Sequence, residues 1–149
     1  MRPIDPWKGS ITKGEKSFLS HPKLISDSYW DSFEWLRDLR EIANEKARIV
    51  SRSLVDEWHL QNSNWDDKTW SPRLIGNRLS NILFCYGTFA DTADNEFQNR
   101  LMKHFASQAR YLELEWKNVE DDFDRLYALL GLMAGRVCLT KQKDEIDYI

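Results

Sequence analysis

The chain has 149 residues, of which 42% are hydrophobic and 13% aromatic, and its formal net charge is −3. This length fits one domain or part of one, and the apolar content is enough for a hydrophobic core, which excludes a disordered tail. Lysines and arginines are spread among acidic residues, which argues against nucleic acid as the main partner because phosphate binding needs a basic face.

The first residues lack the apolar core that a signal peptide needs. The longest apolar run, from Leu126 to Leu139, is interrupted by Arg136 and is too short to span a bilayer. We therefore expect a cytoplasmic protein without a membrane segment.

Residues 1–27 contain all but one of the four prolines and predict an extended, poorly packed N-terminal arm with one short helix, Thr12 to Leu19. A helical domain, residues 28–149, follows. Its first helix is expected to run without a break from Ser28, because aromatic and aliphatic residues cover two helical stripes of this segment. Asn44 can cap the second helix, which ends at the turn Asn62-Ser63-Asn64.

Ser71 and Pro72 predict the start of the third helix, because a serine can cap the free N–H groups and a proline fits the first turn. Gly87 can end this helix in a left-handed conformation. Asp94 is a good cap for the fourth helix. In the fifth helix Gly131 and Gly135 lie one turn apart, so a neighbouring helix can approach closely there. Large apolar residues alternate in this helix at spacings of three and four: Phe123, Leu126, Leu130, Met133 and Val137.

The sum is an all-α fold of five helices with no strand. Short connections make the second and third helices, and the fourth and fifth, antiparallel neighbours. The two cysteines, Cys85 and Cys138, lie inside apolar helical patterns and are interpreted as buried thiols.

Few residues have the spacing of a known reactive site. The three histidines, His21, His59 and His104, are not spaced as metal ligands, and we interpret them as structural or surface residues, with a general base as the alternative. His59 lies near the end of the second helix, a favourable place for a partial positive charge. The acidic clusters at 66–67 and 120–122 precede helices, which is typical of capping and solvation. With no Gly-rich phosphate loop or Cys-x-x-Cys pair, the sequence predicts neither a metal nor a cofactor.

A polar corner at the start of the third helix is the better candidate for binding. Trp65, Trp70, Arg73, Arg78 and Asn81 could line a cleft for an acidic carbohydrate, because indole faces stack on sugar rings and arginine binds carboxylate or sulfate in a fork. In the alternative interpretation the tryptophans plug the ends of helices, and the arginines are solvated or hold loop carbonyls.

Five segments in this order also carry a resemblance to a known family. They are Phe33-Glu34-Trp35-Leu36-Arg37-Asp38-Leu39-Arg40; Leu54-Val55-Asp56-Glu57-Trp58; Trp65 and Trp70-Ser71-Pro72 with Gly76, Arg78 and Leu79; Gln108-Ala109-Arg110-Tyr111-Leu112; and Gly131-Leu132-Met133-Ala134-Gly135. Together with the arm Asp5-Pro6-Trp7-Lys8-Gly9 they resemble the N-terminal helical region of the heparinase II/III-like family.

The resemblance implies an incomplete α/α toroid of paired helices, which in this family precedes a β-sandwich. It implies a polysaccharide lyase that cleaves uronic-acid polymers by β-elimination, with an Asn/His pair and tyrosines that lie beyond this chain. We therefore expect a fragment: the N-terminal portion of such a lyase, not catalytic by itself, with an acidic polysaccharide as partner. The alternatives are a stand-alone helical module that binds a protein through an exposed apolar face, and a small carbohydrate-binding domain.

Overall fold

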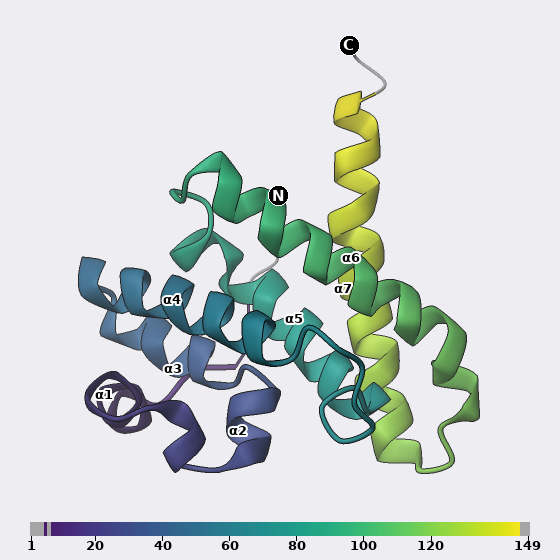
Figure 1. Cartoon of the computed structure of the whole chain (residues 1–149), viewed down its shortest axis with the longest axis horizontal. Helices are drawn as coiled ribbons and strands as arrows, with labels where there is room; N and C mark the ends of the chain where they lie inside the picture. The colour runs from purple at the N-terminus through teal and green to yellow at the C-terminus, as the bar shows by residue number, and fades with distance from the viewer. Residues whose placement is uncertain (1–4, 6, 147–149) are drawn as a thin grey trace.

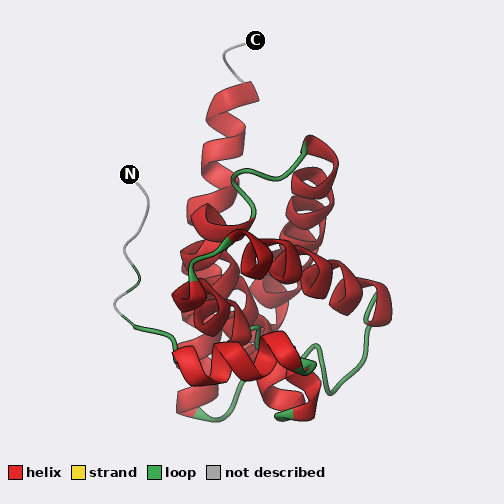
Figure 2. Cartoon of the chain, turned by 90° about the vertical axis from the view of Figure 1, so that its left-hand side faces the viewer, coloured by secondary structure: helices red, strands yellow, loops and turns green. Residues whose placement is uncertain are grey.

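The computed structural model describes residues 5 and 7–146, with side chains up to Leu139. In this part of the chain all regular structure is helical and there is no strand, which confirms the all-α prediction (Figure 2). The toroid arrangement stays a prediction. The elements are α1 (Ile11–Leu19), η1 (Pro22–Leu24), α2 (Asp27–Asp31), α3 (Trp35–Ile42), α4 (Glu45–Gln61), α5 (Pro72–Phe89), α6 (Asn95–Glu115), η2 (Trp116–Asn118) and α7 (Asp122–Ile146), where η marks a 3-10 helix.

Helix α5 is the centre of the arrangement. It contacts α2, α3 and α4 on one side and α6 and α7 on the other. In Figure 1, α3 and α4 lie side by side at one end of the molecule, and the C-terminal end of α7 projects beyond the other helices. None of the helices in the described residues combines the length and the apolar character that crossing a bilayer requires.

The N-terminal arm contains the predicted helix, as α1, but it packs against the body. Tyr29 donates its hydroxyl hydrogen to the buried carboxylate of Asp38 at 2.6 Å, and the same carboxylate accepts from the backbone N–H of Ser10 at 2.6 Å. Further upstream, Asp5 accepts a hydrogen bond from Arg40 at 2.8 Å. Helix α3 therefore holds the arm at two points, through Asp38 at Ser10 and through Arg40 at Asp5.

The predicted unbroken helix from Ser28 is wrong, because the chain breaks between α2 and α3 at Phe33. This residue has a φ of 61°, in the left-handed region. The break places the aromatic residues of both predicted stripes in one hydrophobic core. The rings of Trp30 and Trp35 stack at 5.6 Å, and Phe33 meets Trp58 edge-on at 5.3 Å between centroids.

The predicted helix ends are confirmed at two places and differ at two. Asn44 and Asp94 cap α4 and α6 through their side-chain oxygens, at 2.8 and 2.7 Å from the capped nitrogens. Pro72 begins α5, but the hydroxyl of Ser71 makes no capping hydrogen bond. The predicted end at Gly87 is wrong, because α5 continues to Phe89. Gly87 has no positive φ, so it does not adopt the left-handed conformation of a helix end.

Glycines set the contact between α5 and α7, as the Gly131–Gly135 pair predicts. A Cβ on Gly76 would overlap the backbone carbonyl of Tyr127, and one on Gly131 would overlap the Cα of Gly76. On the next turn, a Cβ on Gly135 would lie 3.1 Å from the Cβ of Ala109 in α6. The small residues of α7 therefore face the body.

The large apolar side chains of α7 face outwards. Phe123 is 73% exposed, Leu126 62%, Met133 65% and Val137 47%, while Leu130 is half-buried. These five residues, the α7 stripe, are the ones that sequence periodicity would place in a core. The close glycine contact explains the reversal, because only the small-residue face lets α7 approach α5 this closely.

Two glycine substitutions in the same helix should have opposite effects. Gly76→Ala should destabilise the fold by about 1–3 kcal/mol, since the new methyl group overlaps the backbone of α7. Gly87→Ala borders an open cavity and should stabilise α5 by about 0.5–1 kcal/mol through helix propensity. Urea unfolding of the two variants measures both effects, and a neutral Gly76→Ala would contradict the close contact.

Candidate functional site

The structure places the five predicted site residues in different environments and not in one cleft. Trp65 lies in the loop between α4 and α5 and is 57% exposed. Arg73 is exposed in the first turn of α5, and Trp70 is half-buried. Arg78 and Asn81 are buried, at 0% and 1% exposure. A polysaccharide on the surface cannot touch these last two residues, which corrects their interpretation as binding groups.

The guanidinium of Arg78 is bound entirely by this chain. Its Nη1 donates to the carbonyl of Asp31 at 2.6 Å, its Nη2 to the carbonyl of Thr69 at 3.0 Å, and its Nε to Oε1 of Gln108 at 2.7 Å. One face of the group lies 4.1 Å from the ring centre of Trp58. The fork therefore joins α2, the loop before α5, and α6 at one point.

The break between α2 and α3 explains why polar side chains are needed here. A helix that stops inside a core leaves carbonyl groups without partners, and each such group is costly. Three side chains donate to these carbonyls: Arg78 to Asp31, Asn81 to Ser32 at 2.9 Å, and the indole of Trp35 to Trp30 at 3.1 Å. For Arg78, the structure therefore favours the alternative in which an arginine holds backbone carbonyls, and Asn81 has the same role.

The charge of Arg78 is balanced inside the core. Burial lowers the pKa of Arg78 to about 9, and the nearby charge of Asp31 opposes this shift. The group thus stays protonated at neutral pH. The Asp31 carboxylate, which is 6% exposed, accepts a hydrogen bond from the indole of Trp58 at 3.0 Å. Trp58 therefore contacts both members of the charged pair.

Two histidines next to this cluster form a stacked pair. The rings of His59 in α4 and His104 in α6 lie 4.1 Å apart and 7° from parallel. His59 is 5% exposed, and neither ring nitrogen has a hydrogen-bond partner. Burial, then His104 and Arg78, hold the pKa of His59 well below its usual value. The position near the end of α4 favours a positive charge on His59, but the loss of hydration outweighs this effect. His59 is therefore neutral.

The stacked histidines do not resemble a metal centre. Two rings that face one another direct their nitrogen lone pairs sideways, so they do not converge on one ion. Among the residues that the structure describes, no three His, Cys, Asp or Glu side chains lie close enough together to hold a metal. Cys85 is buried as predicted, Cys138 only partly, and burial raises the pKa of the Cys85 thiol to about 12. Cys85 therefore forms no thiolate nucleophile at neutral pH.

The exposed part of the polar corner consists of Trp65 and Arg73. Arg73 pairs with Asp124 of α7 at 3.2 Å and lies over the ring of Tyr127. Trp70 meets Tyr111 edge-on at 5.5 Å, with its indole N–H buried and unpaired. Trp65 offers a free indole surface, and Arg73 could exchange Asp124 for a substrate carboxylate. Their role in carbohydrate binding stays a prediction.

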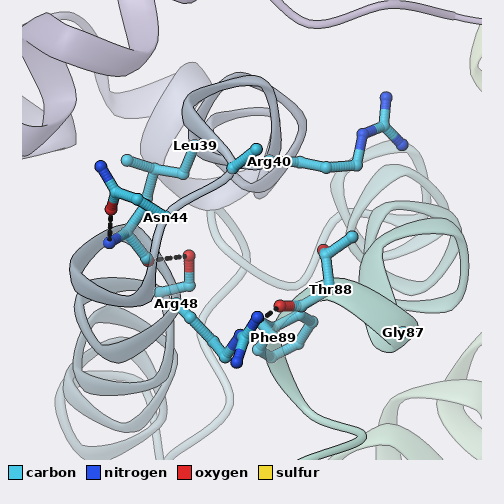
Figure 3. Close-up of a pocket in the computed structure, with 10 residues that line it drawn as sticks. Leu39, Arg40, Asn44, Arg48, Gly87, Thr88 and Phe89 are labelled. Carbon is cyan, nitrogen blue, oxygen red and sulfur yellow. Dashed lines mark hydrogen bonds between the residues drawn. The ribbon is translucent and has the colours of Figure 1, made fainter.

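A cavity of about 220 Å³, which sequence reasoning missed, lies where α3, α4 and α5 meet (Figure 3). Its lining comes from separate segments, so no local motif marks it. The polar groups at its wall are already bound within the chain: Arg48 donates to the carbonyl of Thr88 at 3.2 Å, and Asn44 caps α4. This cavity therefore indicates no particular ligand chemistry.

Replacement of buried Arg78 and of exposed Arg73, both in α5, should destabilise the fold to different extents. Arg78→Met keeps much of the volume but leaves carbonyls, Gln108 and Asp31 without their partner, and should cost about 3–5 kcal/mol of unfolding free energy. Arg73→Ala removes an exposed ion pair and an exposed contact with the Tyr127 ring, and should cost about 1 kcal/mol or less. Chemical denaturation gives both values. Equal losses of unfolding free energy in the two variants would contradict the role of Arg78 in joining α2, α5 and α6.

The stacked histidines should make the fold sensitive to acid. The folded-state pKa of His59 lies below its unfolded value of 6.5, so the unfolded chain binds the proton more readily. The resulting stability is fully present above pH 6.5 and is lost as the pH falls toward the folded-state pKa, by at most about 1.4 kcal/mol per pH unit for each such histidine.

Unfolding curves recorded from pH 7 downwards test this. His59→Phe should flatten the acid loss relative to the wild-type chain. The same slope in the variant and in the wild-type chain would contradict the assignment.

Comparison of the chain with protein-family models, with curated proteins and with solved structures finds no match. The function is therefore inferred from the contacts within this chain and from the resemblance in its sequence.

Proposed function

We propose that this chain is the N-terminal helical part of a heparinase II/III-like polysaccharide lyase, and that it supplies scaffold and not the catalytic residues. One observation supports this most directly: about half of the residues that carry the resemblance are buried, and they lock the helices together. The buried ones are Phe33, Trp35, Leu36, Asp38, Leu39, Leu54, Val55, Trp58, Gly76, Arg78, Leu79, Gln108, Ala109, Leu112, Gly131, Ala134 and Gly135.

The polar members of this set make their hydrogen bonds within the chain. Arg78 donates to Gln108 and lies on Trp58 inside the core. β-Elimination needs a base that reaches the C5 proton of the uronate, a group that neutralises its carboxylate, and an acid at the leaving oxygen. A resemblance carried by core residues points to a common fold, so this chemistry would come from residues outside the segment.

The surface that would touch an acidic polysaccharide is the exposed part of the polar corner. Trp65 can stack on a sugar ring, and the fork of Arg73 matches a uronate carboxylate or a sulfate. Arg73 is anchored by Asp124 at the junction of α5 and α7, so a bound polymer would lie across the start of both helices.

We expect the isolated chain to bind heparin or alginate weakly and to form no unsaturated product in an elimination assay. Trp65→Ala and Arg73→Ala should weaken binding several-fold and lower the melting temperature by a few degrees at most, because both side chains are exposed. Arg100→Ala, which removes an exposed, ion-paired arginine of α6, is the matched control. Affinity electrophoresis measures binding and ultraviolet absorbance measures product.

Two outcomes would contradict the proposal. One is robust turnover by the isolated chain. The other is a transcript whose coding sequence closes after Ile149, with no further helices and no β-sandwich encoded behind it.

A second proposed function is a stand-alone helical interaction module, and the α7 stripe favours it. Large apolar side chains on a helix that is firmly seated from behind form a ready docking surface. In this case charged substitutions on the stripe abolish a complex while the chain stays folded.

A further inference from the structure

The end of α4 and the loop behind it, residues 59–68, lie between two buried anchors. Trp58 comes directly before this segment, and its ring centre lies 4.1 Å from the Arg78 guanidinium. Thr69 comes directly after it, and its carbonyl accepts from the same guanidinium at 3.0 Å. Both anchors are buried. The two ends of the segment are therefore fixed on one side chain.

Between these anchors one side chain holds the segment down. His59 is buried, and every residue from 60 to 68 is exposed or half-buried. Lys68 also ties the segment to α2 through an ion pair with Asp27 at 3.0 Å, but this pair lies at the surface, where such pairs contribute little. Closure of the segment therefore depends mainly on the ring of His59.

His59 is held through the faces and edges of rings and not through hydrogen bonds. It stacks on His104 of α6 at 4.1 Å and meets Phe33 edge-on at 6.0 Å. Neither of its nitrogens has a hydrogen-bond partner in the described part of the chain. A neutral imidazole tolerates this place better than an imidazolium, which adds a second N–H donor and a charge that must be solvated or paired.

The charges around the two stacked rings offer no free partner for such a proton. The groups that face the rings come from α4, α5 and α6, and they are Asp56, Arg78, Arg100 and Lys103. Three of these four are cations. The remaining carboxylate, that of Asp56, is already paired with Arg100 at 2.9 Å. A proton is therefore taken up more readily when the rings separate.

We propose that His59 is a pH-operated latch: in weak acid its ring leaves the stack with His104, and residues 59–68 open while the rest of the fold stays closed. The segment and not α6 is the part that moves, because α6 is anchored in the core by Phe97, Leu101 and Phe105. Regions with few buried contacts open before the core does.

Burial determines the direction of the pH effect. In the closed form the pKa of His59 is lowered first by burial and then by His104 and Arg78, and the pKa of His104 is lowered first by burial and then by Lys103. The open form therefore binds protons more readily. The equilibrium constant for opening should rise by up to about tenfold per pH unit below 6.5 for each ring that titrates.

The latch also bears on the polar corner. Trp65, the residue proposed to stack on a sugar, lies within the segment. The closed latch would hold Trp65 in place at neutral pH, and weak acid would release it. This consequence rests on the proposed lyase function, whereas the latch itself does not.

Backbone hydrogen exchange of the full chain between pH 7.5 and 5, corrected for the intrinsic rates, tests the latch without any polysaccharide. The amides of residues 59–62, at the end of α4, should lose protection by about tenfold per pH unit below 6.5. The amides of residues 78–85 in α5 should stay protected where residues 59–62 open. Protection of 59–62 that does not change with pH, or an equal loss in both segments, would overturn the inference.

Two substitutions at one position separate the proton from the ring. His59→Phe keeps a ring but removes its titration, and should reduce the acid-induced loss of protection at residues 59–62 about tenfold at pH 5.5. His104→Phe, the matched change in the other ring, should reduce it less, because His104 is only half-buried. His59→Ala removes the ring and should open the segment at pH 7.5 as well. A His59→Phe chain that opens in acid like the wild type would overturn the latch.

Affinity electrophoresis in heparin at pH 7.5 tests the consequence for Trp65. His59→Ala should weaken binding several-fold, whereas His59→Phe should bind like the wild type. If none of these chains binds heparin, the proposed function fails, while the exchange measurements still decide whether the latch exists.

Discussion

The buried guanidinium of Arg78 is the constraint on which the rest of the fold depends. A cation that is removed from water must find acceptors for its N–H groups and a nearby negative charge. Here the acceptors are two backbone carbonyls and Gln108, and the charge is that of Asp31. Each partner lies on a different segment, so the placement of one side chain fixes the relation between α2, α5 and α6.

The same contacts satisfy the backbone carbonyls that are left without helical partners when the aromatic residues are buried. Burying Trp30, Phe33 and Trp35 together requires the backbone to break, and a break inside a core exposes carbonyl groups to an apolar environment. Two of the three donors to these groups, Arg78 and Asn81, come from α5, so the break depends on α5. These two polar residues are therefore part of the packing of the aromatic core.

Much of the fold could be predicted from local sequence, because caps and apolar periodicity act over a few residues. Asn44, Asp94 and Pro72 mark helix starts correctly. The break at Phe33 could not be predicted, since its cause is tertiary: the segment alone favours one helix. The burial of Arg78 and the neutral state of His59 are also tertiary effects, as both depend on residues far away in the sequence. The α7 stripe shows that periodicity identifies an apolar face but not what covers it.

The long reach of Arg78 has a consequence for how the chain folds. Its hydrogen bonds extend 47 residues back to Asp31 and 30 residues forward to Gln108. During synthesis the aromatic segment around Phe33 emerges well before α5 and α6, at a stage when one continuous helix is its locally favoured state. We therefore expect the kink to form late, as a product of long-range closure, and folding to be slower than that of a simple bundle with local contacts.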